Sequence, residues 1–271
     1  MSGPRDARLR GDGPPLSLYL TEPARGAADF GLYLAARPLV PRLPRGDGHP
    51  VLVLPGLLAD DTSTHVLRSV LRRLGYRVHG WRLGRNIGPT AACVGGMRDR
   101  IDDLSDRYGR PISLVGWSLG GIFARDLARR TPDSVRQVVT LGSPFRLVRH
   151  SQSRASRAFA RYAHLHVEHR TLPLEPDGCP LPMPTTSIYS RLDGIVHWQT
   201  CLDVPGEHCE NIAVLASHLG LGHHPAALYA LADRLAQPEG RWRPFRPPLV
   251  LRPAFPRPDV PAGGSPVVSA A

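Results

Sequence analysis

The sequence predicts an α/β fold in which a mostly parallel central sheet is flanked by helices. Short apolar runs alternate along the chain with segments of helical periodicity, a pattern typical of parallel sheets with right-handed crossovers. The length of 271 residues, with 42% apolar side chains, suffices for one large domain with a buried core. We therefore expect one domain over residues 16–237, between a disordered N-terminus at 1–15 and a Pro/Arg-rich tail at 238–271.

The first half of the chain begins with an apolar segment, residues 16–40, that we expect to form a helix packed on the domain. The uninterrupted apolar run Pro50–Leu54 predicts a strand buried on both faces. Apolar positions at helical spacing then predict a helix that is capped by Thr62 or Ser63 and stops at Gly75. A strand at residues 76–81 and a helix at residues 94–108 complete this half.

The second half continues the alternation but is interrupted by one insertion, residues 143–184, which holds a basic helix at 153–166. Insertions of this length are usually functional, so we expect a cap that covers the active site and sets substrate preference. The tail is expected to be extended or disordered, although its aromatic side chains can dock on the domain. The remaining elements are strands at 112–115, 135–141, 185–190 and 211–216, and helices at 119–130 and from Pro225.

Charge and cysteine content exclude several classes of partner and site. The formal net charge is +11 and no lysine is present, but we find no zinc-finger spacing, no RNA-binding aromatic signature and no long basic run. We therefore expect no nucleic acid partner, whereas the positive charge is compatible with weak contact with an anionic membrane surface. The four cysteines form no Cys-x-x-Cys pair, so no metal site is expected. Cys201 and Cys209 are spaced for a disulfide in an oxidising compartment, but buried free thiols are the favoured interpretation.

No signal peptide and no run long enough to span a membrane is evident in the sequence. The expectation is a cytoplasmic protein, with peripheral membrane association possible. The sequence does not indicate an oligomeric state.

A nucleophile is predicted at Ser118, in the sequence Gly116-Trp117-Ser118-Leu119-Gly120-Gly121. This segment lies between a predicted strand and a predicted helix, which is the context of a nucleophile elbow. Glycine at 116 and 120 avoids steric clashes in the sharp turn, and the N-terminal amides of the following helix point at the same place.

A serine hydroxyl is a weak nucleophile, so a general base and an acid that orients the base are also required. His218 follows an apolar strand and is the predicted base, whereas His223 and His224 precede Pro225 and more plausibly start the final helix. Asp193 follows the strand at 185–190 and is the predicted acid. The other candidates, Asp203 and Asp177, lack a strand immediately upstream.

The tetrahedral intermediate of acyl transfer carries an oxyanion that needs preorganised backbone donors. One is expected to be the amide of Leu119, directly after the nucleophile. The other is expected in the turn after the first buried strand, Pro55-Gly56-Leu57-Leu58, with the Leu57 amide as first choice and Leu58 as second.

These motifs together, residues 51–56, 116–121, Asp193-Gly194 and Ser217-His218, resemble the bacterial lipase/esterase branch of the α/β-hydrolases, over roughly residues 48–237. The resemblance implies an α/β-hydrolase fold and hydrolysis of a small carboxylic ester or thioester through an acyl-enzyme, without a cofactor. Many secreted lipases of this branch carry His-Gly where Pro55-Gly56 stands here. Two other functions stay open, namely acyl transfer by the same triad and a non-catalytic binding module.

Overall fold

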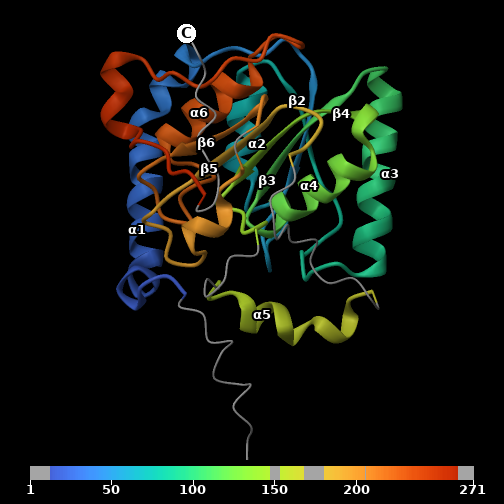
Figure 1. Ribbon diagram of the computed structural model, residues 1–271, viewed down its shortest axis with the longest axis horizontal. Helices are drawn as coiled ribbons and strands as arrows, with labels where there is room; N and C mark the ends of the chain where they lie inside the picture. Colours follow the sequence, from blue (N-terminus) through green and yellow to red (C-terminus); the bar gives the residue numbers. More distant parts are fainter. Residues whose placement is uncertain (1–12, 147–152, 168–179, 205, 262–271) are drawn as a thin grey trace, which may run out of the picture.

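The computed structural model describes residues 13–146, 153–167, 180–204 and 206–261. Six strands form one sheet in the order β2-β1-β3-β4-β5-β6, and every neighbouring pair is parallel (Figure 1). The predicted α/β class with a parallel sheet is thus confirmed. The strands are β1 Pro50–Leu54, β2 Arg77–Gly80, β3 Ile112–Trp117, β4 Val135–Leu141, β5 Thr185–Tyr189 and β6 Cys209–Ala213.

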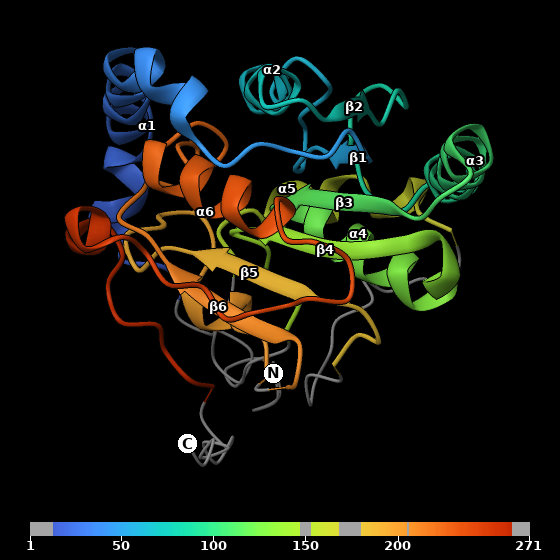
Figure 2. The same ribbon diagram turned by 90° about the horizontal axis from the view of Figure 1, so that it is seen from above.

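Helices cover both faces of this sheet (Figure 2). Alternate residues of β1 point to opposite faces: Val51 and Val53 pack with helices α2 and α6, and Leu52 and Leu54 pack with α3 and α4. The α-helices are α1 Leu16–Ala36, α2 His65–Arg73, α3 Ala91–Tyr108, α4 Leu119–Arg130, α5 Ser156–Arg161 and α6 Pro225–Leu235. The 3₁₀ segments are η2 Arg37–Arg42, η3 Pro132–Ser134, η4 Ala163–Leu165, η5 Trp198–Cys201 and η6 Leu249–Ala254.

Most predicted boundaries differ from the structure by a few residues, and three of the differences are instructive. Helix α2 is preceded by Thr64 rather than by a capping Thr62 or Ser63, because those two residues hydrogen-bond to Asp60 in the preceding turn. Strand β6 begins two residues earlier than predicted, since the polar Glu210 lies within the sheet. The predicted cap helix is also shorter, α5 followed by the 3₁₀ turn η4.

The tail packs on the domain as far as it is described. Phe245 and Phe255 contact each other with ring centroids 4.9 Å apart, and both pack beside Tyr229 of α6. The hydroxyl of Tyr189 lies 2.8 Å from Asp259 Oδ2 and donates to it. Residues 1–12 and 262–271, which include most of the predicted disordered N-terminus and the end of the tail, lie outside the described residues.

Cys201 and Cys209 are free thiols in the structure, and burial raises the pKa of both. None of the described helices combines the length and the apolar character needed to cross a bilayer.

Candidate active site

Ser118 occupies a strained position between β3 and α4. Its φ of 53° lies in the left-handed region, and α4 begins at the next residue. A Cβ at Gly116 would come within 2.3 Å of the Cα of Gly121, and a Cβ at Gly120 within 2.3 Å of the carbonyl oxygen of Leu54. Glycine at 116 and 120 therefore permits the close crossing of backbones that aims Ser118 outward.

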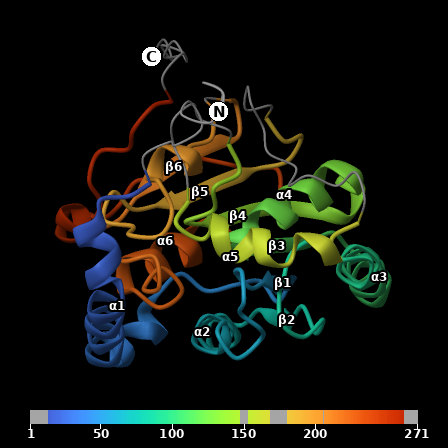
Figure 3. The ribbon, with the colours of Figure 1, turned by 90° about the horizontal axis from the view of Figure 1, so that it is seen from below.

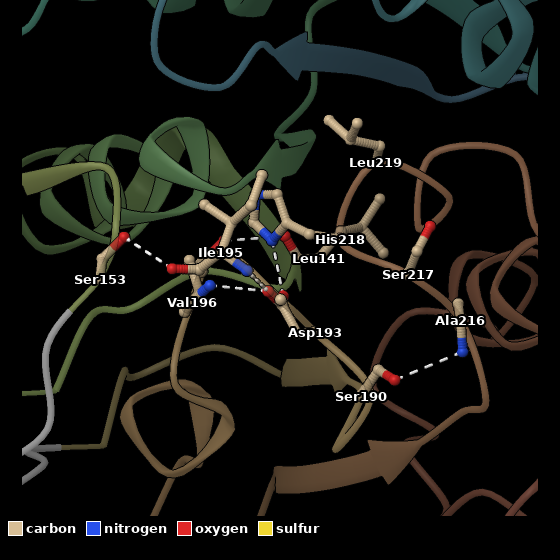
Figure 4. Close-up of polar contacts among 12 residues, drawn as sticks. Leu141, Ser153, Ser190, Asp193, Ile195, Val196, Ala216, Ser217, His218 and Leu219 are labelled. Carbon is tan, nitrogen blue, oxygen red and sulfur yellow. Dashed lines mark hydrogen bonds and ion pairs between the residues drawn. The ribbon is translucent and has the colours of Figure 1, made fainter. Parts of the chain in front are cut away.

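Asp193 and His218 form a buried hydrogen-bonded pair at the same edge of the sheet (Figure 4). Oδ2 of Asp193 lies 2.6 Å from Nδ1 of His218. The other carboxylate oxygen, Oδ1, accepts hydrogen bonds from the amides of Ile195 (2.8 Å) and Val196 (2.7 Å). Both oxygens of Asp193 thus have fixed partners, which sets the orientation of the imidazole ring.

Two hydrogen bonds and one close approach place the serine turn beside this pair. The amide of Ser118 donates to the carbonyl of Leu141 at 2.8 Å. A Cβ on the next residue, Gly142, would lie 3.1 Å from Asp193 Oδ2 and 3.2 Å from His218 Nδ1. On the other side, the indole of Trp117 donates to the carbonyl of His218 at 3.2 Å. Within the described part of the chain, the Ser118 hydroxyl and His218 form no hydrogen bond, and catalytic hydrogen bonds often tighten only with substrate present.

The surroundings of His218 favour its charged form. Burial lowers the pKa of His218, but the charge and hydrogen bond of Asp193 and the charge of Glu22 outweigh it, so the pKa is raised above its usual 6.5. The imidazolium that forms when His218 accepts a proton is thereby stabilised.

The alternative bases and acids have other partners. His224 is the N-cap of α6, where its Nδ1 accepts from the amide of Ala226 at 3.2 Å. His223 lies 3.3 Å from the carbonyl of Gly26. Asp203 is fully buried in an ion pair with Arg125 of α4. Asp177 lies outside the described residues.

The turn after β1 lies against Ser118. A Cβ at Gly56 would sit 3.2 Å from the Cβ of Ser118, so only glycine fits this approach without displacement. The amide of Leu58 donates to the carbonyl of Asn86 at 2.7 Å and is therefore engaged. Among the described residues, the amides of Leu57 and Leu119 have no such partner. This geometry favours Leu57 over Leu58 as an oxyanion donor.

Asn86 fixes this turn and was not found from the sequence. Its side chain is fully buried and donates from Nδ2 to the carbonyl of Pro55 at 2.8 Å. Its backbone accepts from Leu58 and donates to Ala59 at 2.8 Å. Asn86 follows β2 in a loop with no recognisable motif, so only the fold reveals its place beside the turn.

A carboxylate from α1 joins the loops that carry Asp193 and His218. Glu22 is 2% exposed, and its Oε1 accepts a hydrogen bond from the amide of Leu219 at 2.8 Å. Its Oε2 accepts from the amide of Gly194 at 3.0 Å. Leu219 and Gly194 directly follow His218 and Asp193, so one side chain ties both loops together.

Asp29, two turns further along α1, holds the same histidine loop. Its Oδ2 accepts from the amide (2.8 Å) and from the hydroxyl (2.6 Å) of Ser217. Sequence reasoning missed both carboxylates of α1. Their spacing of seven residues, which places them on one helix face, was the only available signal.

A cavity of about 130 Å³ lies between Ser118 and the insertion. Leu57, Leu119 and Ile122 line the wall nearest the serine turn. The insertion supplies the opposite wall, and Figure 3 shows α5 in front of the end of the sheet. The lining residues of the insertion are Pro144, Ser153, Ala155, Ser156 and Phe159.

The side chains of the site are suited to proton transfer and nucleophilic attack. In the described part of the chain, no group of three or more His, Cys, Asp or Glu side chains is arranged to hold a metal ion. A strained serine, a buried imidazole and an oriented carboxylate are the elements of covalent acyl transfer.

Comparison with models of known protein families gives no match. A 60-residue segment is 40% identical to a pimeloyl-[acyl-carrier protein] methyl ester esterase of Chromobacterium violaceum, covering 20% of this chain and 24% of that protein. The chain thus spans about a quarter of the curated relative that it matches.

Among solved structures, lipase B of Aspergillus fumigatus superposes with a TM-score of 0.55 at 16% identity, over 72% of this chain and 54% of that chain. An α/β-hydrolase enzyme from a sediment metagenome of the lagoon of Mar Chica, Morocco, gives a TM-score of 0.47 at 18% identity, over 70% and 90% of the two chains. From its parallel sheet, its strand–serine turn–helix unit and the likeness to lipase B, we conclude that this chain has the α/β-hydrolase fold.

Proposed function

We propose that this chain hydrolyses a carboxylic ester or thioester through an acyl-enzyme formed on Ser118. The observation that carries the proposal is the buried Asp193–His218 pair beside a serine at φ 53°, at the start of α4. Strain of this kind costs about 1–3 kcal/mol and persists where a fold over-determines it, most often at functional sites. The short match to a methyl ester esterase supports the same reaction class.

In the proposed reaction, Ser118 Oγ attacks the carbonyl carbon while His218 Nε2 accepts the hydroxyl proton. Asp193 holds the Nδ1–H tautomer and stabilises the imidazolium. The amides of Leu57 and Leu119 donate to the oxyanion, and each such donor contributes about 3 kcal/mol in the transition state. The intermediate collapses as His218 protonates the departing alcohol or thiol. Water, deprotonated by His218, then attacks the acyl-enzyme and releases the acid with Ser118 restored.

The size of the cavity favours substrates with a small acyl group. Its volume of about 130 Å³ is below the range of about 300–1,000 Å³ typical of sites for drug-sized ligands. Its walls are apolar apart from serine hydroxyls. We therefore expect esters and thioesters of short acyl chains to react faster than those of long chains.

Covalent labelling tests the proposal directly. A fluorophosphonate probe should label the wild-type chain and not the Ser118→Ala variant, which should also lose turnover of p-nitrophenyl acetate by several orders of magnitude. Circular dichroism checks that the variant is folded. Labelling that persists in Ser118→Ala would place the nucleophile elsewhere. Product analysis with added alcohols, in which new esters replace the free acid, would instead indicate acyl transfer.

A further inference from the structure

Helix α1 buries polar side chains and exposes apolar ones, the reverse of an ordinary surface helix. Its buried positions are Glu22, Gly26, Asp29 and Tyr33. Along the whole of α1, which the structure describes in full, no exposed side chain is charged, since Arg25 is only partly exposed. A surface helix normally turns its apolar stripe to the core and its charges to water. The apolar side of α1 instead faces outward.

Exposed apolar surface continues from α1 onto the neighbouring 3₁₀ segments. Leu20 of α1 is 69% exposed and Leu34 is 50% exposed, while Leu39 of η2 and Val250 of η6 are also exposed. A groove of about 750 Å³ lies between the end of α1, η2, α6 and η6, and Leu39 and Val250 are among its lining residues. Figures 1 and 2 show α1 and η6 on the same side of the molecule. We call this surface, formed by the outer side of α1 with η2 and η6, the α1 face.

The exposed charges on the segments that form the α1 face are basic. Arg37 and Arg42 of η2 and Arg252 of η6 are exposed at its edge. Residues 13–46 and 241–258 are all described, and none of their acidic side chains is exposed. Glu22 and Asp29 lie on the buried side of α1. The α1 face is therefore apolar with a basic rim.

We propose that the α1 face binds the surface of an anionic lipid bilayer, with α1 lying in the plane of the interface. An apolar helix face flanked by arginines is the pattern of interfacial helices. A second copy of the chain is a poorer occupant, because a two-fold contact would bring the same arginines together without an acid to pair with them. Anionic headgroups supply the negative charge that the protein lacks there.

This surface adjoins the cap. Arg154 donates from Nε to the carbonyl of Pro14, just before α1, at 2.9 Å, and its guanidinium lies 5.3 Å from the ring centre of Tyr19. Ser153, next to Arg154, lines the cavity with Ser118. A bilayer bound by α1 therefore lies beside the proposed active site, although the binding itself does not depend on the proposed hydrolysis.

Vesicle sedimentation tests the proposal on the full chain carrying Ser118→Ala, so that hydrolysis of lipid cannot alter the vesicles. We expect binding to phosphatidylcholine vesicles that contain phosphatidylglycerol, and much weaker binding to phosphatidylcholine alone. Because each arginine near an anionic surface strengthens partitioning about fivefold, changing Arg37, Arg42 and Arg252 to Gln should weaken it about a hundredfold.

Apolar contacts are tested with Leu20→Gln and Leu34→Gln, which keep helix propensity and touch exposed positions only. Each should weaken binding roughly tenfold, since a buried leucine contributes that much or more. The matched control is Leu165→Gln in η4, 47% exposed, which should bind like the parent. A thermal unfolding midpoint equal to that of the parent chain confirms that each variant is folded.

Three outcomes would overturn the proposal. A folded chain that binds neither type of vesicle, or both equally, removes the role of anionic lipid. Loss of binding in Leu165→Gln equal to that in Leu34→Gln assigns the contact to the cap. A dimer detected by light scattering that Leu20→Gln dissociates makes the α1 face an interface between copies. A failed Ser118 labelling experiment would leave all these results unaffected.

Discussion

Replacing Glu22 with Gln tests whether α1 positions the catalytic loops. The carboxylate accepts from the amides of Gly194 and Leu219 and from Arg25 Nη2 (2.6 Å). A Gln side chain has one acceptor oxygen, so it leaves one buried amide unpaired. We expect a stability loss of about 1–3 kcal/mol, the cost of one buried unsatisfied donor. We also expect kcat to fall roughly 10- to 100-fold, because a shift of about 1 Å in a catalytic group costs on that order.

The pH profile provides a second measure of the same change. In the proposed reaction His218 must be neutral to accept the Ser118 proton, so kcat/KM should rise with pH through the pKa of His218. Burial lowers this pKa, but the charges of Asp193 and Glu22 raise it overall. Loss of the Glu22 charge should therefore shift the acidic limb of the profile to lower pH.

The matched control is Glu210→Gln, at the other end of β6 from the His218 loop. Glu210 is also a largely buried carboxylate, paired with Arg234 and accepting from the amide of Phe245 at 2.7 Å. Its variant should lose stability with kcat and the pH profile unchanged. If Glu22→Gln behaves in the same way, Glu22 is a structural residue only and does not position the loops of Asp193 and His218.

Three further predictions concern the site itself, each measured with p-nitrophenyl esters. Asp193→Asn should lower kcat by about 10⁴-fold through the wrong histidine tautomer, whereas His224→Ala should keep most activity. Asn86→Ala should release the turn that presents the Leu57 amide and lower kcat up to about 100-fold with little change in KM. A change in KM as large as the change in kcat would contradict this role. Phe159→Ala should enlarge the cavity and raise kcat/KM for longer acyl chains relative to acetate; an unchanged ratio would show that the cap wall does not select chain length.

The elements predicted well are those that their own residues determine. Pro50–Leu54 and Val135–Leu141 are continuous apolar runs buried on both faces, and the structure places strands at these same bounds. Helix Leu119–Arg130 was also placed correctly, because the glycines around Ser118 restrict where the turn can end. The fold class followed from the order of such elements.

The supports of the site could not be predicted, because their partners are distant in sequence. In the sequence Glu22 cannot be distinguished from an ordinary exposed acid of a helix, because its partners Gly194 and Leu219 are brought to it only by the fold. The boundary of β6 was missed for a related reason, since Glu210 is polar and becomes compatible with the sheet through its contacts with Arg234 of α6 and the amide of Phe245. Local periodicity contains no information on such pairs.

The long sequence separation between α1 and its hydrogen-bond partners has a consequence for the order of folding. Glu22 meets its two amide partners across 172 and 197 residues, and Asp29 meets Ser217 across 188. During synthesis α1 leaves the ribosome well before these partners, which follow it by 172 to 197 residues. Contacts of such long sequence separation form late because loop-closure entropy opposes them. The nascent chain therefore leaves Glu22 and Asp29 without these partners until residues 194–219 have emerged, and α1 joins the loops of Asp193 and His218 only after that.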